Sequence, residues 1–169
     1  NNWNNGGVAP ASRCDDQREE VDIHRHLGYV LNYYWLTHGR NSLDDNGMTV
    51  KAHAHNMYDP ANTGMPDNAF WWGWPSEIYV GDGSGALPGF DFLCPLEVMA
   101  HEYTHGINDK CGILQTYDGE IGALDEALAD IGGALIASDY PVEDPAPWNV
   151  GEQCDLHSPK RGRNMADPS

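Results

Sequence analysis

Two histidines that lie four residues apart, His101 and His105, form the pattern H-E-x-x-H with Glu102. In a helix this spacing places both imidazoles on one side, about one turn apart. Two neutral imidazoles at that separation can bind one zinc ion, and the carboxylate of Glu102 can transfer a proton beside it. The pattern alone is a modest signal, because a surface helix can carry two histidines by coincidence.

A third candidate ligand lies in the segment Gly122 to Gly133. There Glu126 follows His105 by 21 residues, and three protein ligands leave the fourth position of a catalytic zinc open to water. One helical turn later, Asp130 can accept the outward N–H of a histidine ligand and so fix its tautomer. The two segments together predict a zinc site whose ligands are His101, His105 and Glu126.

Both motifs lie in segments whose residues predict helices. From Leu96 to Ile107, apolar residues recur at steps of three and four, which is helical spacing. Pro95 suits the first helical position, and Gly112 suits a stop just beyond the end. A second helix is predicted for residues 119–136. These two helices must pack together for the three ligands to meet.

A longer helix is predicted near the start of the chain. Asp15 or Asp16 can cap it, and the helical pattern continues to about Thr37. Its expected apolar stripe consists of Val21, His24, Gly28, Leu31 and Trp35, with Tyr34 alongside.

Short strands are predicted between the helices. Apolar and polar residues alternate over residues 48–55, which predicts a strand with one buried face. Residues 68–71 predict an edge strand, and residues 77–80 predict another strand. No third ligand is evident beside His53 and His55, so we interpret them as part of a solvated face. The pattern favours an α+β fold, with long helices beside a small, mostly antiparallel sheet.

The length and charge of the chain limit its class. Its 169 residues suffice for one domain. The net charge of −17 argues against partners with many phosphates, both nucleic acids and anionic membrane surfaces. No apolar run approaches the roughly 20 residues that a membrane span requires. The chain starts at Asn1 without methionine, which we interpret as a processed or partial product.

The motifs taken together resemble the thermolysin-like zinc metallopeptidases. The resemblance runs from about Val21 to the last residues, with one departure at Asp125, where the family usually has Asn. It implies the N-terminal lobe of the thermolysin fold and a secreted zinc endopeptidase that acts on polypeptides. The segments that carry the resemblance are Asn68–Trp71, Tyr79–Gly83, His101–His105, Gly122–Asp130 and Arg163–Pro168.

The resemblance also implies roles for individual residues around the zinc. In it, Glu102 is the general base, and Tyr117 stabilises the oxyanion that forms on the substrate. Asp125 and Asp130 lie next to the zinc ligands, on the side away from the metal, and hold them in place. The substrate is held by residues that contact its main chain or line its side-chain pocket: Asn68, Ala69, Val98 with Val150, and Arg163.

A calcium site is the least complete part of the resemblance. Matching places the family's calcium ligands at Glu97, Ala137, Pro147, Asn149 and Glu152. Only Glu97 and Glu152 carry a charge, whereas calcium prefers six to eight oxygens. We therefore expect a single calcium ion, or disulfides in place of the ions.

Four cysteines, in a family that is mainly secreted, suggest two disulfides. Cys94 and Cys111 flank the zinc helix and lie beyond disulfide reach of each other. Two pairings remain, Cys14–Cys111 with Cys94–Cys154, or Cys14–Cys94 with Cys111–Cys154, and we favour the first. Four free thiols are the alternative.

Members of the family continue into a C-terminal helical lobe that forms the other wall of the cleft and supplies a further histidine. We therefore expect this chain to be the zinc-bearing core of a longer product, a fragment, or part of an assembly. The alternative function is a non-catalytic assembly protein that keeps a zinc-stapled core and associates with itself through an exposed apolar face. A zinc aminopeptidase is less well supported, because no acidic anchor for a substrate amino terminus is evident.

Overall fold

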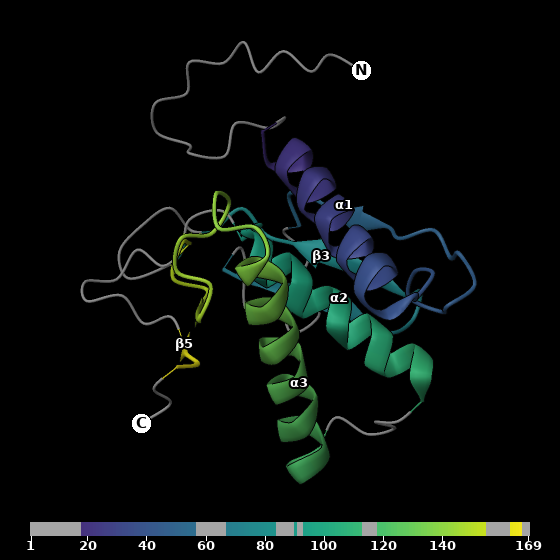
Figure 1. Cartoon of the computed structure of the whole chain (residues 1–169). Helices are drawn as coiled ribbons and strands as arrows, with labels where there is room; N and C mark the ends of the chain where they lie inside the picture. Colours follow the sequence, from purple (N-terminus) through teal and green to yellow (C-terminus); the bar gives the residue numbers. More distant parts are fainter. Residues whose placement is uncertain are drawn as a thin grey trace.

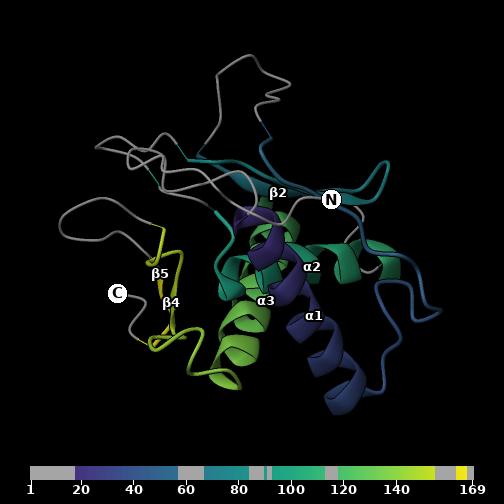
Figure 2. The same ribbon diagram turned by 90° about the horizontal axis from the view of Figure 1, so that it is seen from above.

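A computed structural model describes residues 18–56, 67–83, 90, 93–112, 118–154 and 163–166. Its central element is helix α2 (Leu96–Cys111), which contacts the other two helices and the larger sheet (Figure 1). Helices α1 (Arg18–His38) and α3 (Gly119–Ser138) lie on one side of α2, and the sheet lies on the other (Figure 2). None of the described helices is long and apolar enough to span a membrane.

The larger sheet has three strands in the order β1-β3-β2. Strand β2 (Ala69–Trp72) pairs antiparallel with β3 (Glu77–Val80), and β1 (Ala52–His53) pairs parallel with β3. A second, antiparallel pair is formed by β4 (Asn149–Val150) and β5 (Arg163–Asn164). The fold is thus α+β with a mostly antiparallel sheet, as the sequence predicts.

The strand predicted over residues 48–55 is much shorter than expected. At its start, the main chain of Met48 bonds to the side chains of Ser42 and Asp44 in the preceding turn. At its end, His55 takes up a left-handed conformation with φ 56°, which an extended strand cannot contain. Only Ala52 and His53 therefore remain in β1.

The apolar stripe predicted for α1 is wrong. Val21 and Trp35 are 42% and 57% exposed, and the helix buries a neighbouring face that includes two polar residues. The α1 residues that are buried are Glu19, Ile23, His26, Leu27 and Val30. The ring of Tyr34 packs 5.5 Å from that of Tyr103 on α2, and this contact helps to fix which face turns inward.

Helix α2 ends where its sequence predicts, but it begins at Leu96, so Pro95 is the N-cap residue and not the first helical residue. Its last residue is Cys111, and the C-cap residue Gly112 has a φ of 64° in the left-handed region. Residues without a Cβ adopt that conformation at no steric cost, so glycine is the usual residue at a helix end. The helix core, formed by Leu96, Met99, Ala100 and Tyr103, is fully buried between α1 and the sheet.

Close packing of α2 against α3 depends on two glycines. Along the shared face, α3 residues from Asp125 to Gly133 meet α2 residues in descending order from Asn108 to Glu97, so the helices run antiparallel. A Cβ added at Gly133 would lie 2.7 Å from the carbonyl oxygen of Glu97, and one at Gly132 would collide with Thr104. The missing side chains let the helices approach closely enough for their polar residues to meet.

We expect the substitution Gly133→Ala to destabilise the protein, because its methyl group meets backbone rather than a movable side chain. Overpacking of this kind costs about 1–3 kcal/mol, measurable by urea unfolding. Gly28→Ala in α1 is the matched control, since nothing lies within 4 Å of its Cβ position. That helix-interior change should stabilise the protein by up to about 1 kcal/mol. Equal stability of Gly133→Ala and the parent would contradict this account of the interface.

Candidate metal centre

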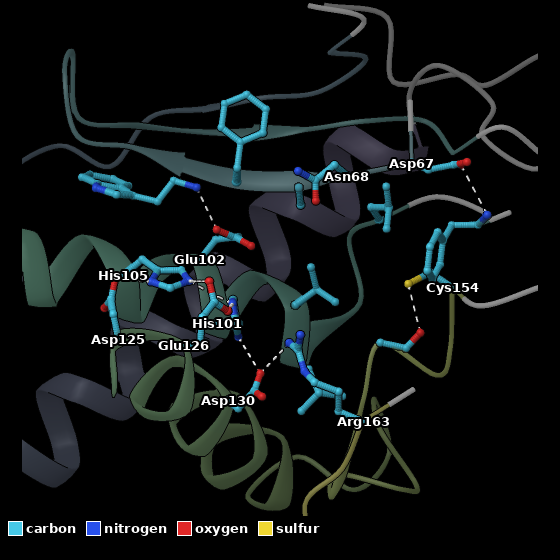
Figure 3. Close-up of a pocket in the computed structure, with 18 residues that line it drawn as sticks. Asp67, Asn68, His101, Glu102, His105, Asp125, Glu126, Asp130, Cys154 and Arg163 are labelled. Atoms are coloured by element: carbon cyan, nitrogen blue, oxygen red, sulfur yellow. Dashed lines mark hydrogen bonds and ion pairs between the residues drawn. The ribbon is translucent and has the colours of Figure 1, made fainter. Parts of the chain in front are cut away.

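Three potential metal ligands converge where α2 and α3 pack together. Nε2 of His101 and Nε2 of His105 are 3.0 Å apart. The carboxylate of Glu126 on α3 faces both, with Oε2 3.4 Å from His101 Nε2 and Oε1 3.6 Å from His105 Nε2. Figure 3 shows the three side chains pointing toward one another at the wall of a cavity.

The donor set and its spacing fit zinc. Two imidazole nitrogens and one carboxylate are ligands that zinc favours, and tetrahedral bonds of about 2.0–2.1 Å place ligand atoms about 3.3 Å apart. The observed separations of 3.0, 3.4 and 3.6 Å bracket that value. Three ligands would leave one position of a tetrahedral ion facing the cavity.

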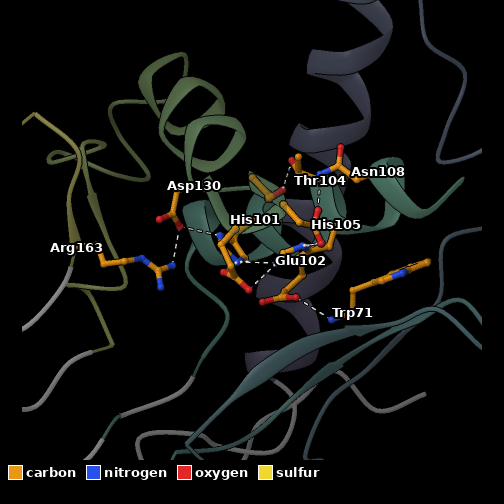
Figure 4. Close-up of polar contacts among 11 residues, drawn as sticks. Trp71, His101, Glu102, Thr104, His105, Asn108, Asp130 and Arg163 are labelled. Atoms are coloured by element: carbon orange, nitrogen blue, oxygen red, sulfur yellow. Dashed lines mark hydrogen bonds and ion pairs between the residues drawn. The ribbon is translucent and has the colours of Figure 1, made fainter. Parts of the chain in front are cut away.

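The outward nitrogens of both histidines face carboxylates. Nδ1 of His101 lies 2.9 Å from Oδ1 of Asp130 (Figure 4), and Nδ1 of His105 lies 3.0 Å from Oδ2 of Asp125, which Figure 3 labels. Each contact favours the tautomer that carries its proton on Nδ1 and leaves Nε2 free to bind a metal. Asp125, the departure from the family pattern, thus lies where its oxygen meets an imidazole N–H.

Two further contacts hold these carboxylates in place. Asn108 donates a hydrogen bond of 2.7 Å to Asp125, and Arg163 in β5 makes an ion pair of 2.6 Å with Asp130. The sequence analysis did not single out Asn108. Its position three residues after His105, on the same face of α2, is the signal that could have identified it.

Glu102 is oriented by the sheet rather than by the helices. Its Oε2 accepts a hydrogen bond of 2.7 Å from the main-chain N–H of Trp71 in β2. Burial raises the pKa of Glu102 to about 7, although the neighbouring His101 opposes the change. A carboxylate whose pKa lies near neutrality can both accept and return a proton at neutral pH.

The electrostatics of the site favour a cation. Burial alone would lower the pKa of His101, but hydrogen bonds with Asp130 and Glu126 raise it to about 9. Burial and the nearby His101 lower the pKa of His105. Four carboxylates therefore surround two imidazoles that differ in their tendency to hold a proton, and positive charge is stabilised between them.

A cavity of about 870 Å³ opens beside the three potential ligands. The sheet contributes Asn68 and Ala69 to its wall, α2 contributes Val98, and β5 contributes Arg163. All four are residues for which the resemblance implied contact with a substrate. Val150 and Leu93 add apolar surface to the same cavity.

Other residues predicted for the site lie elsewhere or outside the described residues. Tyr117 belongs to the part of the chain that the structure does not describe. Glu97 is fully buried on α2 and does not line the cavity, and Glu152 is partly buried in the turn after β4. Asp144, which was not predicted from the sequence, is fully buried, and its negative charge raises the pKa of Glu97.

The cysteine pairing is not supported within the described residues. Among the described residues, Cys94, Cys111 and Cys154 form no disulfide with one another, and Cys14 lies outside the described residues. Cys111 is exposed at the end of α2, whereas Cys154 is buried in the core, so their pairing is wrong for this structure. Cys94 and Cys154 are buried in the same apolar cluster, yet the favoured bond between them is absent.

Comparisons with known proteins agree with the geometry. The sequence model described as thermolysin metallopeptidase, catalytic domain, matches residues 1–109, and the one described as thermolysin metallopeptidase, alpha-helical domain, matches residues 115–169. Bacillolysin from Bacillus cereus is 35% identical over 156 residues, which cover 88% of this chain and 25% of bacillolysin. Thermolysin from Alicyclobacillus acidocaldarius is 36% identical over 155 residues, which cover 88% of this chain and 26% of thermolysin.

A solved structure is similar as well. The precursor of protealysin, a metalloproteinase from Serratia proteamaculans, superposes with a TM-score of 0.68 at 27% sequence identity. The match covers 84% of this chain and 42% of that precursor. This chain spans about a quarter of the length of the curated relatives named above.

Removing the negative charge of Asp130 should weaken metal binding without unfolding the site. Asp130→Asn keeps the shape of the side chain but loses the charge that faces His101. Changes of this kind typically reduce metal affinity about 10–100-fold, which a zinc titration against a chromophoric chelator can measure. Asp139→Asn, at the exposed C-terminal end of α3, is the matched control and should leave the affinity unchanged. Equal affinities for the two variants would show that Asp130 does not support the ligand.

Proposed function

This chain belongs to the thermolysin metallopeptidase family, and from that premise we propose that it carries the zinc-binding core of a metalloendopeptidase. The observation that carries the proposal is the convergence of His101, His105 and Glu126 beside the carboxylate of Glu102. Zinc, when bound, would supply Lewis-acid polarisation of the substrate carbonyl and acidify a water molecule. This chain spans about a quarter of the length of its relatives. We therefore propose, and do not infer from them directly, that the whole protein hydrolyses peptide bonds.

In this proposal Glu102 moves the proton. Its carboxylate takes a proton from the attacking water and later delivers it to the nitrogen of the leaving amine. The Trp71 N–H holds one oxygen of Glu102 in place, so the sheet that would bind the substrate also fixes the base. The role of Tyr117 as an oxyanion donor stays a prediction, since that residue lies outside the described part of the chain.

We propose that the substrate binds as an extended strand along β2. In the described sheet β2 is an edge strand, and Asn68 O is bonded to Gly81 N on the β3 side. Trp71 N–H instead points away from β3 toward Glu102, so the main-chain groups of Ala69, two residues earlier, face the same outer edge. Pairing through main-chain groups would tolerate many substrate sequences.

Side-chain selection would then come from the apolar end of the cavity. Val98 and Val150 line it together, and they favour an apolar residue after the scissile bond. Arg163 is 57% exposed while its guanidinium is paired with Asp130. Since that group has five N–H donors in a fixed plane, it can keep this ion pair and still donate to a substrate carbonyl.

We also propose a single cation site next to Glu97. Glu97 and Asp144 are both fully buried, and within the described structure Oε2 of the first and Oδ2 of the second have no hydrogen-bond partner. Burial and the charge of Asp144 raise the pKa of Glu97 to about 8, and Glu152 contributes in the same direction. Three carboxylates can supply several of the six to eight oxygens that calcium requires.

The remaining surface supports a partner for α3. Its outer face carries an apolar stripe at helical spacing whose members are each between 38% and 51% exposed: Ile121, Leu124, Leu128, Ile131 and Leu135. We propose that further polypeptide of the kind present in the longer relatives covers this stripe. A self-associating, non-catalytic assembly protein is the second candidate function that the same stripe favours.

The single-domain organisation of residues 1–169 and secretion stay predictions.

Glu102→Gln should abolish most peptide hydrolysis while zinc remains bound, because an amide cannot accept the proton. The expected loss is about 10²–10⁴-fold, measured on an unstructured, fluorescently labelled protein with and without a chelator. Glu120→Gln, in the exposed first turn of α3, is the control and should retain parental activity. Activity in Glu102→Gln equal to that of the parent would remove the mechanism. Ordered oligomers, with zinc bound but no turnover in any variant, would favour the assembly protein.

Calcium should raise the melting temperature of the protein through Glu97 and Asp144. Saturation to about 100 times the dissociation constant adds about 2.7 kcal/mol to the free energy of unfolding. That corresponds to a rise of about 5–11 °C in a chain of this size, measured by calorimetry with and without calcium. Asp144→Asn should remove most of the rise, whereas Asp139→Asn at an exposed site should keep it. A melting temperature that calcium does not change would contradict the cation site.

A further inference from the structure

A second group of potential metal ligands lies where the start of α1 meets the ends of β1 and β3. It consists of Glu19, His55 and Asp82, which we call the His55 cluster. Nδ1 of His55 lies 2.7 Å from Oδ1 of Asp82 and 3.4 Å from Oε2 of Glu19. All three potential ligand atoms lie within 4.8 Å of one another, and none of these residues lines the cavity of the zinc site.

The three side chains are brought together by separate elements. Glu19 comes from the first turn of α1, and Asp82 follows β3. The segment that carries His55 is held beside β3 by a hydrogen bond of 2.9 Å from Asn56 N to Val80 O. His55 itself has φ 56°, an uncommon conformation for a residue with a side chain, and such conformations cluster at binding sites.

This backbone turn separates His55 from His53. His53 remains in β1, stacks on Tyr79 and bonds to Glu77 over 2.7 Å, with its side chain 46% exposed. The solvated face predicted from sequence therefore describes His53. For His55 that prediction is wrong, because the left-handed residue redirects its imidazole to two carboxylates.

The donor atoms and the burial of the His55 cluster suit a cation. Glu19 is only 1% exposed, and burying a carboxylate is costly unless opposite charge lies nearby. A divalent ion bound by both carboxylates would bring charge of the opposite sign next to them. The side chains of His55 and Asp82 are 29% and 34% exposed, which leaves a route of entry from solvent.

We propose that the His55 cluster binds a second divalent transition-metal ion, with zinc the best match, which ties the start of α1 to the sheet. An imidazole nitrogen with two carboxylate oxygens suits zinc and its first-row neighbours, whereas calcium takes oxygen ligands only. The 3.4 Å between His55 and Glu19 lies within the range of 3.0 to 3.6 Å found between the potential ligands of α2 and α3, and the 2.7 Å between His55 and Asp82 is shorter. This second ion has a structural role, and its existence does not depend on catalysis.

The test is the number of zinc ions bound by the full chain, measured by native mass spectrometry and elemental analysis after dialysis against zinc in excess calcium. We expect two ions in the parent and one in each of His55→Gln, Asp82→Asn and Glu19→Gln. His53→Gln is the matched control, since it removes a histidine two residues away and should leave two ions bound. A double variant, His101→Gln with His105→Gln, should retain one ion, which the His55 cluster holds.

The proposal would be overturned if the folded His55→Gln variant bound as many ions as the parent. Circular dichroism reports whether each variant folds. If His55→Gln or Glu19→Gln does not fold, Asp82→Asn and the double variant decide, because Asp82 is a third exposed and the double variant leaves the His55 cluster intact. A double variant that folds and binds no zinc would refute the second site, whether or not the chain hydrolyses peptides.

Discussion

The close antiparallel contact of α2 with α3 is the constraint on which the candidate metal centre depends. Two ligands lie on one helix and the third on the other, so they meet only if the helix axes approach closely. Gly132 and Gly133 permit that approach, because a side chain at either would strike α2. The polar residues that line the contact then meet in register, from Asn108 with Asp125 to His101 with Asp130. The close packing of α2 on α3 and the convergence of the potential metal ligands thus depend on the same short distance between the two helices.

The candidate metal centre is also the place where the sheet and the β4-β5 pair contact the helices. The sheet reaches it through the N–H of Trp71 on Glu102, and the β4-β5 pair reaches it through Arg163 on Asp130. Tyr34 of α1 packs on Tyr103 of α2, and its hydroxyl lies 3.0 Å from the hydroxyl of Thr104. Each layer of the fold therefore contributes a contact that limits how the central helix can rotate.

Sequence reasoning succeeded where spacing alone determines geometry. The four-residue interval between His101 and His105 fixes their relative direction in any helix, and Pro95 and Gly112 mark its ends. It failed where geometry depends on distant parts of the chain. In helix α1, apolar residues recur at helical spacing on two faces. The buried face includes the polar residues Glu19 and His26, so a search for apolar residues does not find it. Asp144 and Asp82 were missed because each meets its neighbours only through the tertiary fold. The family resemblance supported Glu126 as the third ligand, but it could not identify residues that are specific to this chain.

The ion pair of Arg163 with Asp130 carries a consequence for how the site responds to its surroundings. A single oxygen of Asp130 faces Nδ1 of His101 at 2.9 Å and the guanidinium of Arg163 at 2.6 Å. Since both partners draw on the same electron density, a stronger bond to one weakens the bond to the other. Events at the imidazole and events at the guanidinium are thereby thermodynamically linked, and such linkage is reciprocal. Through this one carboxylate oxygen, a ligand that binds at Arg163 would change the affinity of His101 for a metal ion, and a metal ion at His101 would change the affinity of Arg163 for its ligand.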